Sequence, residues 1–217
     1  MEKRIQLFCD HNFAVREARG EYLLFLNNDV EIITESWLEE MLQLCQQKDV
    51  GMAGAKLYYP DDTIQHAGVV VGLGGVAAHV LCKLPRDAEG YMGRLRCVQE
   101  ISAVTAACMM VKTSVFKAVG GFDEELKVAF NDIDLCMKVR KYGVKIVFTP
   151  YAELYHYESK SRGMEDTPEK QLRFSREVNC FRRKWERELL KGDPYYNPNL
   201  TLNNTDCSLR KQEKNGD

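Results

Sequence analysis

The sequence has no apolar run long enough to cross a membrane. The longest run, residues 67–81, falls short of the ~20 residues that a transmembrane helix needs and contains four glycines and His79. No apolar stretch follows the charges at residues 2–4, so we expect no signal peptide. Charge of one sign is also lacking: 30 Lys and Arg residues against 32 Asp and Glu residues give a net charge of −2. That balance provides no bulk attraction to nucleic acid. What remains is a chain of 217 residues, 45% hydrophobic, which is long enough to bury a substantial core.

The eight cysteines never occur in C-x-x-C spacing. This argues against a zinc ribbon and against a thioredoxin-type redox motif. Several of them, such as Cys45, Cys108 and Cys136, lie within apolar runs. We therefore predict buried free thiols in the reducing environment of the cytoplasm.

Helical and strand-like hydrophobic patterns alternate along the chain, which indicates an α/β protein. We predict helices at residues 12–19, 34–47, 113–120, 135–142 and 167–190. We predict strands at 22–26, 50–59, 64–71, 101–112 and 145–149, with 151–156 extended after Pro150. The unbroken apolar run at 22–26 is typical of a central strand that is buried on both faces.

Three connecting segments also have a pattern of their own. A Pro-Asp-Asp turn at residues 60–62 separates strands 50–59 and 64–71, so these should form a hairpin. Residues 72–95 are rich in glycine and predict a long loop, a kind of loop that is often functional. Residues 192–217 are polar and contain two prolines, which predicts a loosely attached tail.

Polar side chains follow the first predicted strand directly. Asn27, Asn28 and Asp29 come after its last apolar residue, and open α/β sheets place ligands at the carboxyl ends of strands. A turn or helix-capping cluster is the simpler interpretation of these residue types. Asp29 is also a candidate ligand for a hard divalent cation, which prefers oxygen.

Two aspartates precede the predicted helix at 135–142. Asp134 is expected to be its N-cap, because the helix should start directly after it. Asp132 then has no obvious structural role. A carboxylate at such a junction can act as a general base if a substrate hydroxyl comes within hydrogen-bond reach.

His156 ends the extended segment 151–156 and is followed by a polar run that contains Lys160 and Arg162. The positively charged side chains of Lys160 and Arg162 could balance phosphate charge, although a solvated loop is the simpler interpretation. His66 and His79 are expected to be ordinary structural histidines.

The order of these segments resembles glycosyltransferase family 2, whose members have the GT-A fold and use nucleotide-sugar donors. The resemblance rests on the motifs GEYLLFLNND at 20–29, GGFDE at 120–124 and NDIDL at 131–135, followed by His156. It covers roughly residues 11–163. The segment HYESKSRG at 156–163 is most similar to bacterial rhamnosyltransferases of cell-surface polysaccharide synthesis.

The resemblance implies a role for individual residues. The family's metal-binding Asp-x-Asp motif falls on residues 27–29, with Asn27 in place of the first aspartate, so Asp29 should be the main metal-facing carboxylate. His156 matches a histidine near the metal and diphosphate. Asp132 matches the catalytic base, with Asn131 in place of the usual glutamate, and Asp134 matches a further acidic position, on the acceptor side.

Donor contacts are expected from Asn27, Asn28, Lys160 and Arg162. The implied reaction is transfer with inversion from a dTDP- or UDP-sugar to a glycan or lipid-linked glycan. It is assisted by Mg²⁺ or Mn²⁺, takes place in the cytoplasm and has rhamnose as the candidate sugar. The implied architecture is a partial GT-A (Rossmann-like) fold, a mixed sheet flanked by helices with a C-terminal helix.

Family members carry about a hundred residues of nucleotide-binding βαβαβ structure before the strand that here starts at residue 22. We therefore expect this chain to correspond to the C-terminal part of such an enzyme and to be inactive alone. We also expect an exposed sheet edge next to residues 22–27 that favours self-association. A non-catalytic module that binds sugars or a partner stays open as the alternative. A Mg²⁺ phosphotransferase would explain the acids but not the order of the motifs.

We divide the chain into a glycosyltransferase portion at 1–165, a basic amphipathic helix at 166–191 and a polar tail at 192–217. In the helix, arginines and lysines interleave with Leu172, Phe174, Val178, Phe181 and Trp185. Two interpretations stay open for it: packing on the domain with a solvated basic face, or a peripheral contact with an anionic bilayer at the inner face of the membrane.

Overall fold

The computed structural model describes residues 7–157 and 167–211. Its α-helices are α1 (Leu7–Glu17), α2 (Trp37–Cys45), α3 (Thr113–Ala118), α4 (Asn131–Tyr142), α5 (Pro168–Lys184) and α6 (Glu186–Lys191). Its strands are β1 (Tyr22–Leu26), β2 (Val30–Ile32), β3 (Val50–Tyr58), β4 (Ile64–His66), β5 (Val69–Val71), β6 (Ala77–His79), β7 (Gln99–Glu100), β8 (Cys108–Lys112) and β9 (Lys145–His156). Two short 3₁₀ helices, Leu73–Gly75 and Tyr91–Arg96, lie in the long connection after β5.

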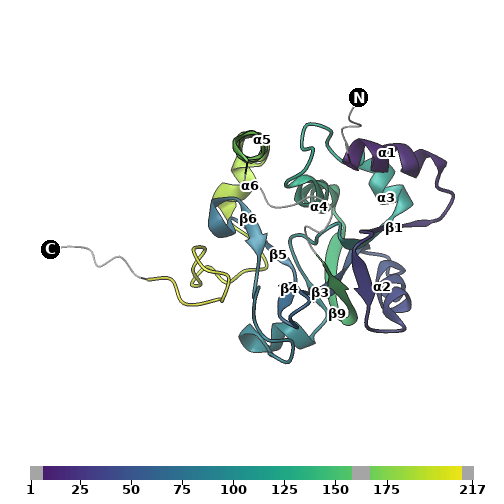
Figure 1. Ribbon diagram of the computed structural model, residues 1–217. Coiled ribbons are helices and arrows are strands. Elements are labelled where there is room, and N and C mark those ends of the chain that lie inside the picture. Colours follow the sequence, from purple (N-terminus) through teal and green to yellow (C-terminus); the bar gives the residue numbers. More distant parts are fainter. Residues whose placement is uncertain (1–6, 158–166, 212–217) are drawn as a thin grey trace.

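The main sheet is mixed and runs in the order β1-β8-β3-β9-β2, with β4 paired to β3 and β7 to β9. Strands β3 and β9 are parallel, whereas β8 is antiparallel to both β1 and β3. The small β5–β6 sheet lies beside it (Figure 1). The prediction of an α/β protein is confirmed.

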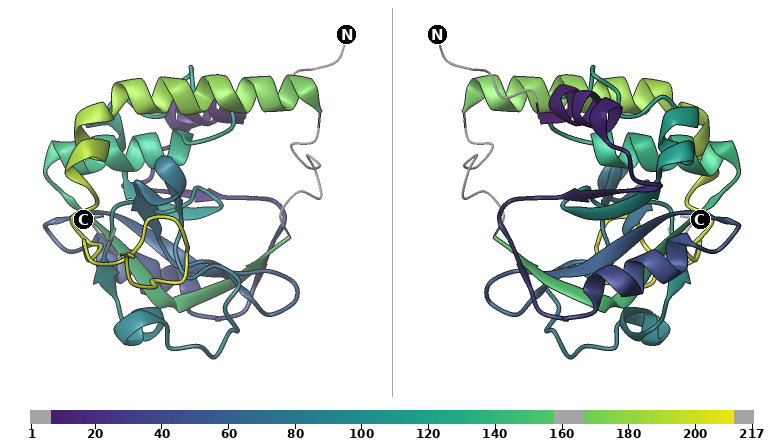
Figure 2. Two further views of the ribbon diagram at one scale, coloured as in Figure 1. Left: turned by 90° about the vertical axis from the view of Figure 1, so that its left-hand side faces the viewer. Right: turned by 90° about the vertical axis from the view of Figure 1, so that its right-hand side faces the viewer.

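Helices cover both faces of this sheet, because alternate residues of its strands point to opposite sides. On one face α2 packs its buried Trp37 and Met41 against β3, β8 and β9. On the other face α1, α3 and α4 join a larger cluster that also takes in Phe181 of α5. Figure 2 shows α5 lying on the outside of this layer, alongside α4.

The strand predicted at residues 22–26 is confirmed as β1. It lies at the end of the strand order, however, so the prediction that it is the central strand is wrong. Its burial alternates, and Leu24 and Leu26 are exposed. The centre is held by β3, all nine residues of which are buried. Among the described residues β1 pairs only with β8, so its other edge has no strand partner there. Self-association through this edge stays a prediction.

Strand β9 is more than twice as long as the strand predicted at 145–149, since it continues through Pro150 to His156. The register between β3 and β9 shifts between the pairs Gly54–Phe148 and Lys56–Glu153. A proline inside a sheet is tolerated at such an irregularity, where no ladder hydrogen bond is lost. The continuation carries His156 to the far end of the sheet, where it pairs with Val30 of β2.

The predicted hairpin is confirmed for β3 and β4, which are antiparallel. The second strand stops at His66, however, because β5 turns away to pair with β6. Residues 101–107 are not a strand, so the strand predicted at 101–112 is reduced to β8. Predicted helix 167–190 is present as α5 and α6, separated at Trp185.

The described part of the tail is held firmly, so the prediction of a loose attachment is wrong. Asp193 accepts a hydrogen bond from the Val71 backbone N–H at 2.8 Å, and Leu202 O accepts one from Gly74 N at 2.8 Å. Tyr196 and Leu200 are buried. Backbone polar groups of the β5–β6 region find their partners in the tail, which seals that end of the core.

Cys45, Cys108 and Cys136 are free thiols buried in the core, as predicted. Burial raises the pKa of Cys45 and of Cys108 to about 12, which keeps both thiols neutral and unreactive. In the part of the chain that the structure describes, every helix is too short or too polar to span a bilayer.

Candidate active site

The loop of residues 27–29 joins β1 to β2, and β2 pairs with the end of β9. The backbone N–H of Tyr157 donates to Asp29 O at 2.8 Å, directly after the Val30–His156 pair. Sheet pairing thereby places a side chain from residue 29 next to one from residue 156. The polar ends of β1 and β9 meet at one place, as open α/β sheets require of a ligand site.

Three of the predicted residues form a compact group at this place. His156 Nε2 lies 3.3 Å from Asp29 Oδ1 and 3.0 Å from Asn27 Nδ2. The side chains of His156 and Asp29 are 11% and 16% exposed. A carboxylate and an imidazole this close, shielded yet still reachable, can hold a cation together.

Gln65 of β4 completes the group from the opposite side of the imidazole ring. Its Oε1 lies 2.6 Å from His156 Nδ1, and its Nε2 donates to His156 O at 3.2 Å. Sequence reasoning missed Gln65. The available signal was a Gln-His pair inside an otherwise apolar strand, where each buried polar group needs a partner.

His66, the neighbour of Gln65, is fully buried and pairs with His79, with the two Nδ1 atoms 3.0 Å apart. Burial lowers the pKa of His66 well below the usual value, and the nearby His79 and His156 act in the same direction. His66 is therefore held as the neutral imidazole in the folded protein.

Asp132 lies in the first turn of α4, where it is half-buried. Its Oδ2 accepts from Ala106 N at 3.2 Å and its Oδ1 from Ile133 N at 2.9 Å. The next residue, Ala107, accepts from Asn27 N at 3.0 Å. Asp132 and Asn27 thus form hydrogen bonds with the adjacent residues Ala106 and Ala107. These bonds place the start of α4 near the end of β1.

Helix α4 begins at Asn131, with Phe130 as its N-cap, so Asp134 is not the cap that we predicted. Phe130 takes a positive φ of 62°, and the chain enters the helix four residues early. Asp134 consequently lies inside the helix and is 0% exposed.

The carboxylate of Asp134 is used within the fold. It accepts from Trp185 Nε1 and from Lys184 Nζ, each at 2.8 Å, and lies 3.4 Å from Lys138 Nζ. Burial lowers the pKa of Lys138, although Asp134 opposes the shift. Burial also opposes the charged form of Lys184, but hydrogen bonds to Asp123 and Asp134 outweigh it and raise the Lys184 pKa. Asp134 therefore joins α4 to α5 and α6, and the acceptor-side position assigned to it is not at an open surface.

The remaining predicted donor contacts are Asn28, Lys160 and Arg162. Asn28 is exposed in the turn before Asp29. Lys160 and Arg162 lie outside the described residues.

The donor set suits a metal that is completed by a substrate. Within residues 7–157 and 167–211 no three His, Cys, Asp or Glu side chains form a potential metal cluster. Mg²⁺ and similar ions commonly take one or two carboxylates from the protein and further oxygens from substrate phosphates. Asp29 supplies the carboxylate of that pattern, with the His156 imidazole beside it, and a closed structural metal cage does not fit.

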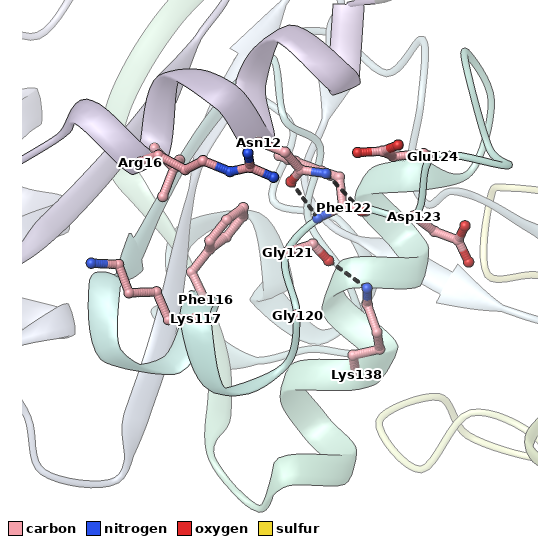
Figure 3. Close-up of a pocket in the computed structure, with 11 residues that line it drawn as sticks. Asn12, Arg16, Phe116, Lys117, Gly120, Gly121, Phe122, Asp123, Glu124 and Lys138 are labelled. Atoms are coloured by element: carbon pink, nitrogen blue, oxygen red, sulfur yellow. Dashed lines mark hydrogen bonds between the residues drawn. The ribbon is translucent and has the colours of Figure 1, made fainter.

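The GGFDE segment at 120–124 lies elsewhere, in a pocket of about 540 Å³ between α1, α3 and α4 (Figure 3). The backbone N–H of Phe122 donates to Asn12 Oδ1, and Asn12 Nδ2 donates to Phe122 O, each at 3.0 Å. Lys138 donates to Gly121 O. A Cβ at Gly121 would lie 2.6 Å from Asn12 Oδ1, so the glycine lets α1 approach this loop. The segment fixes α1 to α4 and supports the position of β1.

Residues 7–177 match the model of a family described as glycosyltransferase-like. The chain belongs to this family. It is 56% identical over 200 residues to y4gI, an uncharacterized protein of Sinorhizobium fredii, and 40% identical over 208 residues to the O-antigen biosynthesis protein RfbC of Myxococcus xanthus. These matches cover 92% and 95% of this chain but 22% and 16% of the two relatives, so the chain spans about a fifth of their length or less.

A shorter match supports the same family. Over 62 residues, 29% of this chain and 20% of the relative, the chain is 36% identical to a Mycobacterium tuberculosis N-acetylglucosaminyl-diphospho-decaprenol L-rhamnosyltransferase.

Two solved glycosyltransferases share the fold. GalNAc-T7 with UDP, GalNAc and Mn²⁺ superposes with a TM-score of 0.61 at 14% identity, over 88% of this chain and 36% of that chain. The mannosyltransferase PcManGT of Pyrobaculum calidifontis, in complex with GDP-Man and Mn²⁺, gives 0.52 at 16%, over 81% and 42%. The mixed sheet flanked by helices is the GT-A fold, as predicted.

Proposed function

We propose that this chain forms the metal- and acceptor-facing part of an inverting glycosyltransferase. The enzyme moves a sugar from a nucleoside diphosphate donor to a glycan of the cell surface. The observation that carries the proposal is the group of Asp29, His156 and Asn27 at the joined ends of β1 and β9. Family membership and the names of the relatives support the reaction class.

Asp29 and His156 would hold Mg²⁺ or Mn²⁺ beside the diphosphate, with Asn27 and Asn28 near the donor. When bound, the ion would stabilise the negative charge that the leaving diphosphate develops. Both structural neighbours were solved with Mn²⁺ and a nucleotide or nucleotide sugar, which supports this role.

Asp132 is the proposed general base. Backbone N–H groups from Ala106 and Ile133 hold its two oxygens in a fixed orientation, and the side chain keeps some exposure to solvent. It would take the proton of the acceptor hydroxyl while that oxygen bonds to the anomeric carbon and the bond from carbon to diphosphate breaks. One displacement of this kind inverts the anomeric configuration.

We propose rhamnose as the transferred sugar and a dTDP- or UDP-sugar as the donor. The acceptor proposed is a glycan or a lipid-linked glycan. The names of the Myxococcus and Mycobacterium relatives support both choices. Weak donor binding by the 217-residue chain alone stays a prediction, as does a location at the inner face of the membrane.

The test is to place this chain in RfbC of Myxococcus xanthus in exchange for the matching segment, and to measure transfer from dTDP-rhamnose and UDP-sugars with Mn²⁺ or Mg²⁺. Asp132→Asn should lower turnover by about 10²–10⁴-fold and leave donor binding nearly intact, because a base acts on the acceptor. Asp87→Asn, an exposed carboxylate, is the matched control. Normal turnover in Asp132→Asn would contradict the assignment of the base. Sugar binding without transfer by RfbC that carries the unaltered chain would favour the non-catalytic alternative.

A further inference from the structure

We propose that Gln65 is a positioning residue that holds His156 as its Nδ1–H tautomer and directs the Nε2 lone pair toward Asn27 and Asp29. The inference rests on the proposed function, since it assigns His156 Nε2 as the atom that would meet a cation.

The orientation of the Gln65 amide follows from the group it contacts on one side. His156 O is a backbone carbonyl and can only accept, so the Gln65 NH₂ group must face it, and the observed distance is 3.2 Å. The amide oxygen then has to face the imidazole ring, where it lies 2.6 Å from Nδ1. An amide oxygen can only accept, so Nδ1 must carry the proton.

The other side of the ring agrees with this assignment. A neutral imidazole protonated at Nδ1 has a lone pair at Nε2, and Asn27 Nδ2 lies 3.0 Å from that atom as a donor. Asp29 Oδ1 lies 3.3 Å from the same atom. Both are acceptors in this tautomer, so the carboxylate and the lone pair would be joined by a shared cation and not by a hydrogen bond. A histidine that binds a metal needs this form, with the second nitrogen donating to an oxygen that fixes the ring.

Gln65 is well placed to impose the tautomer because it is itself immobilised. It is 4% exposed, and its neighbours Ile64 and His66 in β4 are both 0% exposed. β4 pairs with the central strand β3. The two hydrogen bonds to residue 156 therefore connect the end of β9 to the most buried part of the sheet.

A role in stability alone would also involve these hydrogen bonds, so the test needs a readout of the tautomer. Gln65→Met keeps the length of the side chain and removes the two hydrogen bonds to His156. Gln65→Glu keeps an acceptor for Nδ1–H. Thr149→Val, a buried polar residue in the same strand as His156, is the matched control.

The tautomer is read from imidazole ¹⁵N shifts of the metal-free chain at about pH 8, where an ordinary histidine is neutral. The His156 signal is identified by its loss in His156→Gln. We expect Nδ1–H in the unaltered chain, in Gln65→Glu and in Thr149→Val, and a shift toward Nε2–H in Gln65→Met. An Nε2–H tautomer in the unaltered chain, or no shift in Gln65→Met, would overturn the proposal.

Mn²⁺ binding, followed by electron paramagnetic resonance of the free ion, separates this inference from the proposed function. Gln65→Met should weaken Mn²⁺ binding by about 10–100-fold, as loss of a partner behind a metal-binding histidine does, and Thr149→Val should not. If the tautomer changes and Mn²⁺ affinity does not, the positioning of the ring stands but His156 is no metal ligand, and the proposed function loses its carrying observation.

Discussion

Asp134→Asn should destabilise the protein strongly, because it removes the negative charge from a site where two lysines converge. The Asp134 side chain is 0% exposed, and the side chains of Lys138 and Lys184 are 19% and 33% exposed. Asparagine can still accept from Trp185 Nε1, so the main change is the loss of charge and not of shape.

Removing one partner of a fully buried ion pair costs about 3–5 kcal/mol. Both lysines here keep some contact with water, and Lys184 also keeps Asp123. We therefore expect a loss of about 2–3 kcal/mol in the free energy of unfolding, below the fully buried range. For a domain of this size that corresponds to a fall in Tm of roughly 4–12 °C.

Asp132→Asn is the matched control, since it makes the same substitution two residues earlier in α4. Asp132 accepts hydrogen bonds from two backbone N–H groups and has no ion-pair partner among the described residues. Asparagine retains one acceptor oxygen but leaves one backbone N–H without its acceptor, so the expected loss is about 1 kcal/mol, smaller than that of Asp134→Asn. The assay is urea unfolding of both variants, followed by tryptophan fluorescence. Equal stability losses, or a loss below about 0.5 kcal/mol for Asp134→Asn, would refute the structural role of Asp134.

Three further predictions follow from other parts of the structure. Asp29→Ala should weaken Mn²⁺ binding by at least about tenfold, which titration calorimetry measures; unchanged affinity would remove Asp29 from the metal site. The pKa of His66 is lowered in the folded state, so the unfolded chain binds its proton first. Stability is then unaffected above about pH 6.5 and decreases as the pH falls below it. His66→Gln should reduce that slope by up to about 1.4 kcal/mol per pH unit, and an unaltered slope would contradict a neutral His66. On α5, Phe181 is buried whereas Leu172 and Phe174 are exposed beside basic side chains; if α5 contacts membranes, the chain should co-sediment with anionic but not neutral liposomes, and equal or absent binding would leave α5 as a packed surface helix.

The sequence was sufficient for the class of fold and for most of its elements. Continuous apolar runs and helical periodicity reflect burial that any α/β packing would require, so β3, α2 and α5 lie close to the predicted ranges. The motif order was sufficient for the family, which the match over residues 7–177 confirms.

Only the tertiary structure decided where these elements lie in the sheet. An apolar run such as residues 22–26 can form either an edge strand or a central strand of a sheet, because one face of an edge strand can also be buried. Similarly, Pro150 ends a strand in isolation, whereas the register shift between β3 and β9 accommodates it and extends β9 to His156.

For the site, the sequence alone identified candidate side chains but not their partners. Asp29 and His156 are 127 positions apart and meet because β2 pairs with the end of β9. Asp132 and Asp134 look alike in sequence, yet the positive φ of Phe130 starts α4 early, so that one carboxylate is half-buried and the other is enclosed by Lys138, Lys184 and Trp185. Tertiary packing determines which strands distant in sequence form hydrogen bonds with each other. The contact between Gln65 and His156 could therefore be identified only in the folded chain.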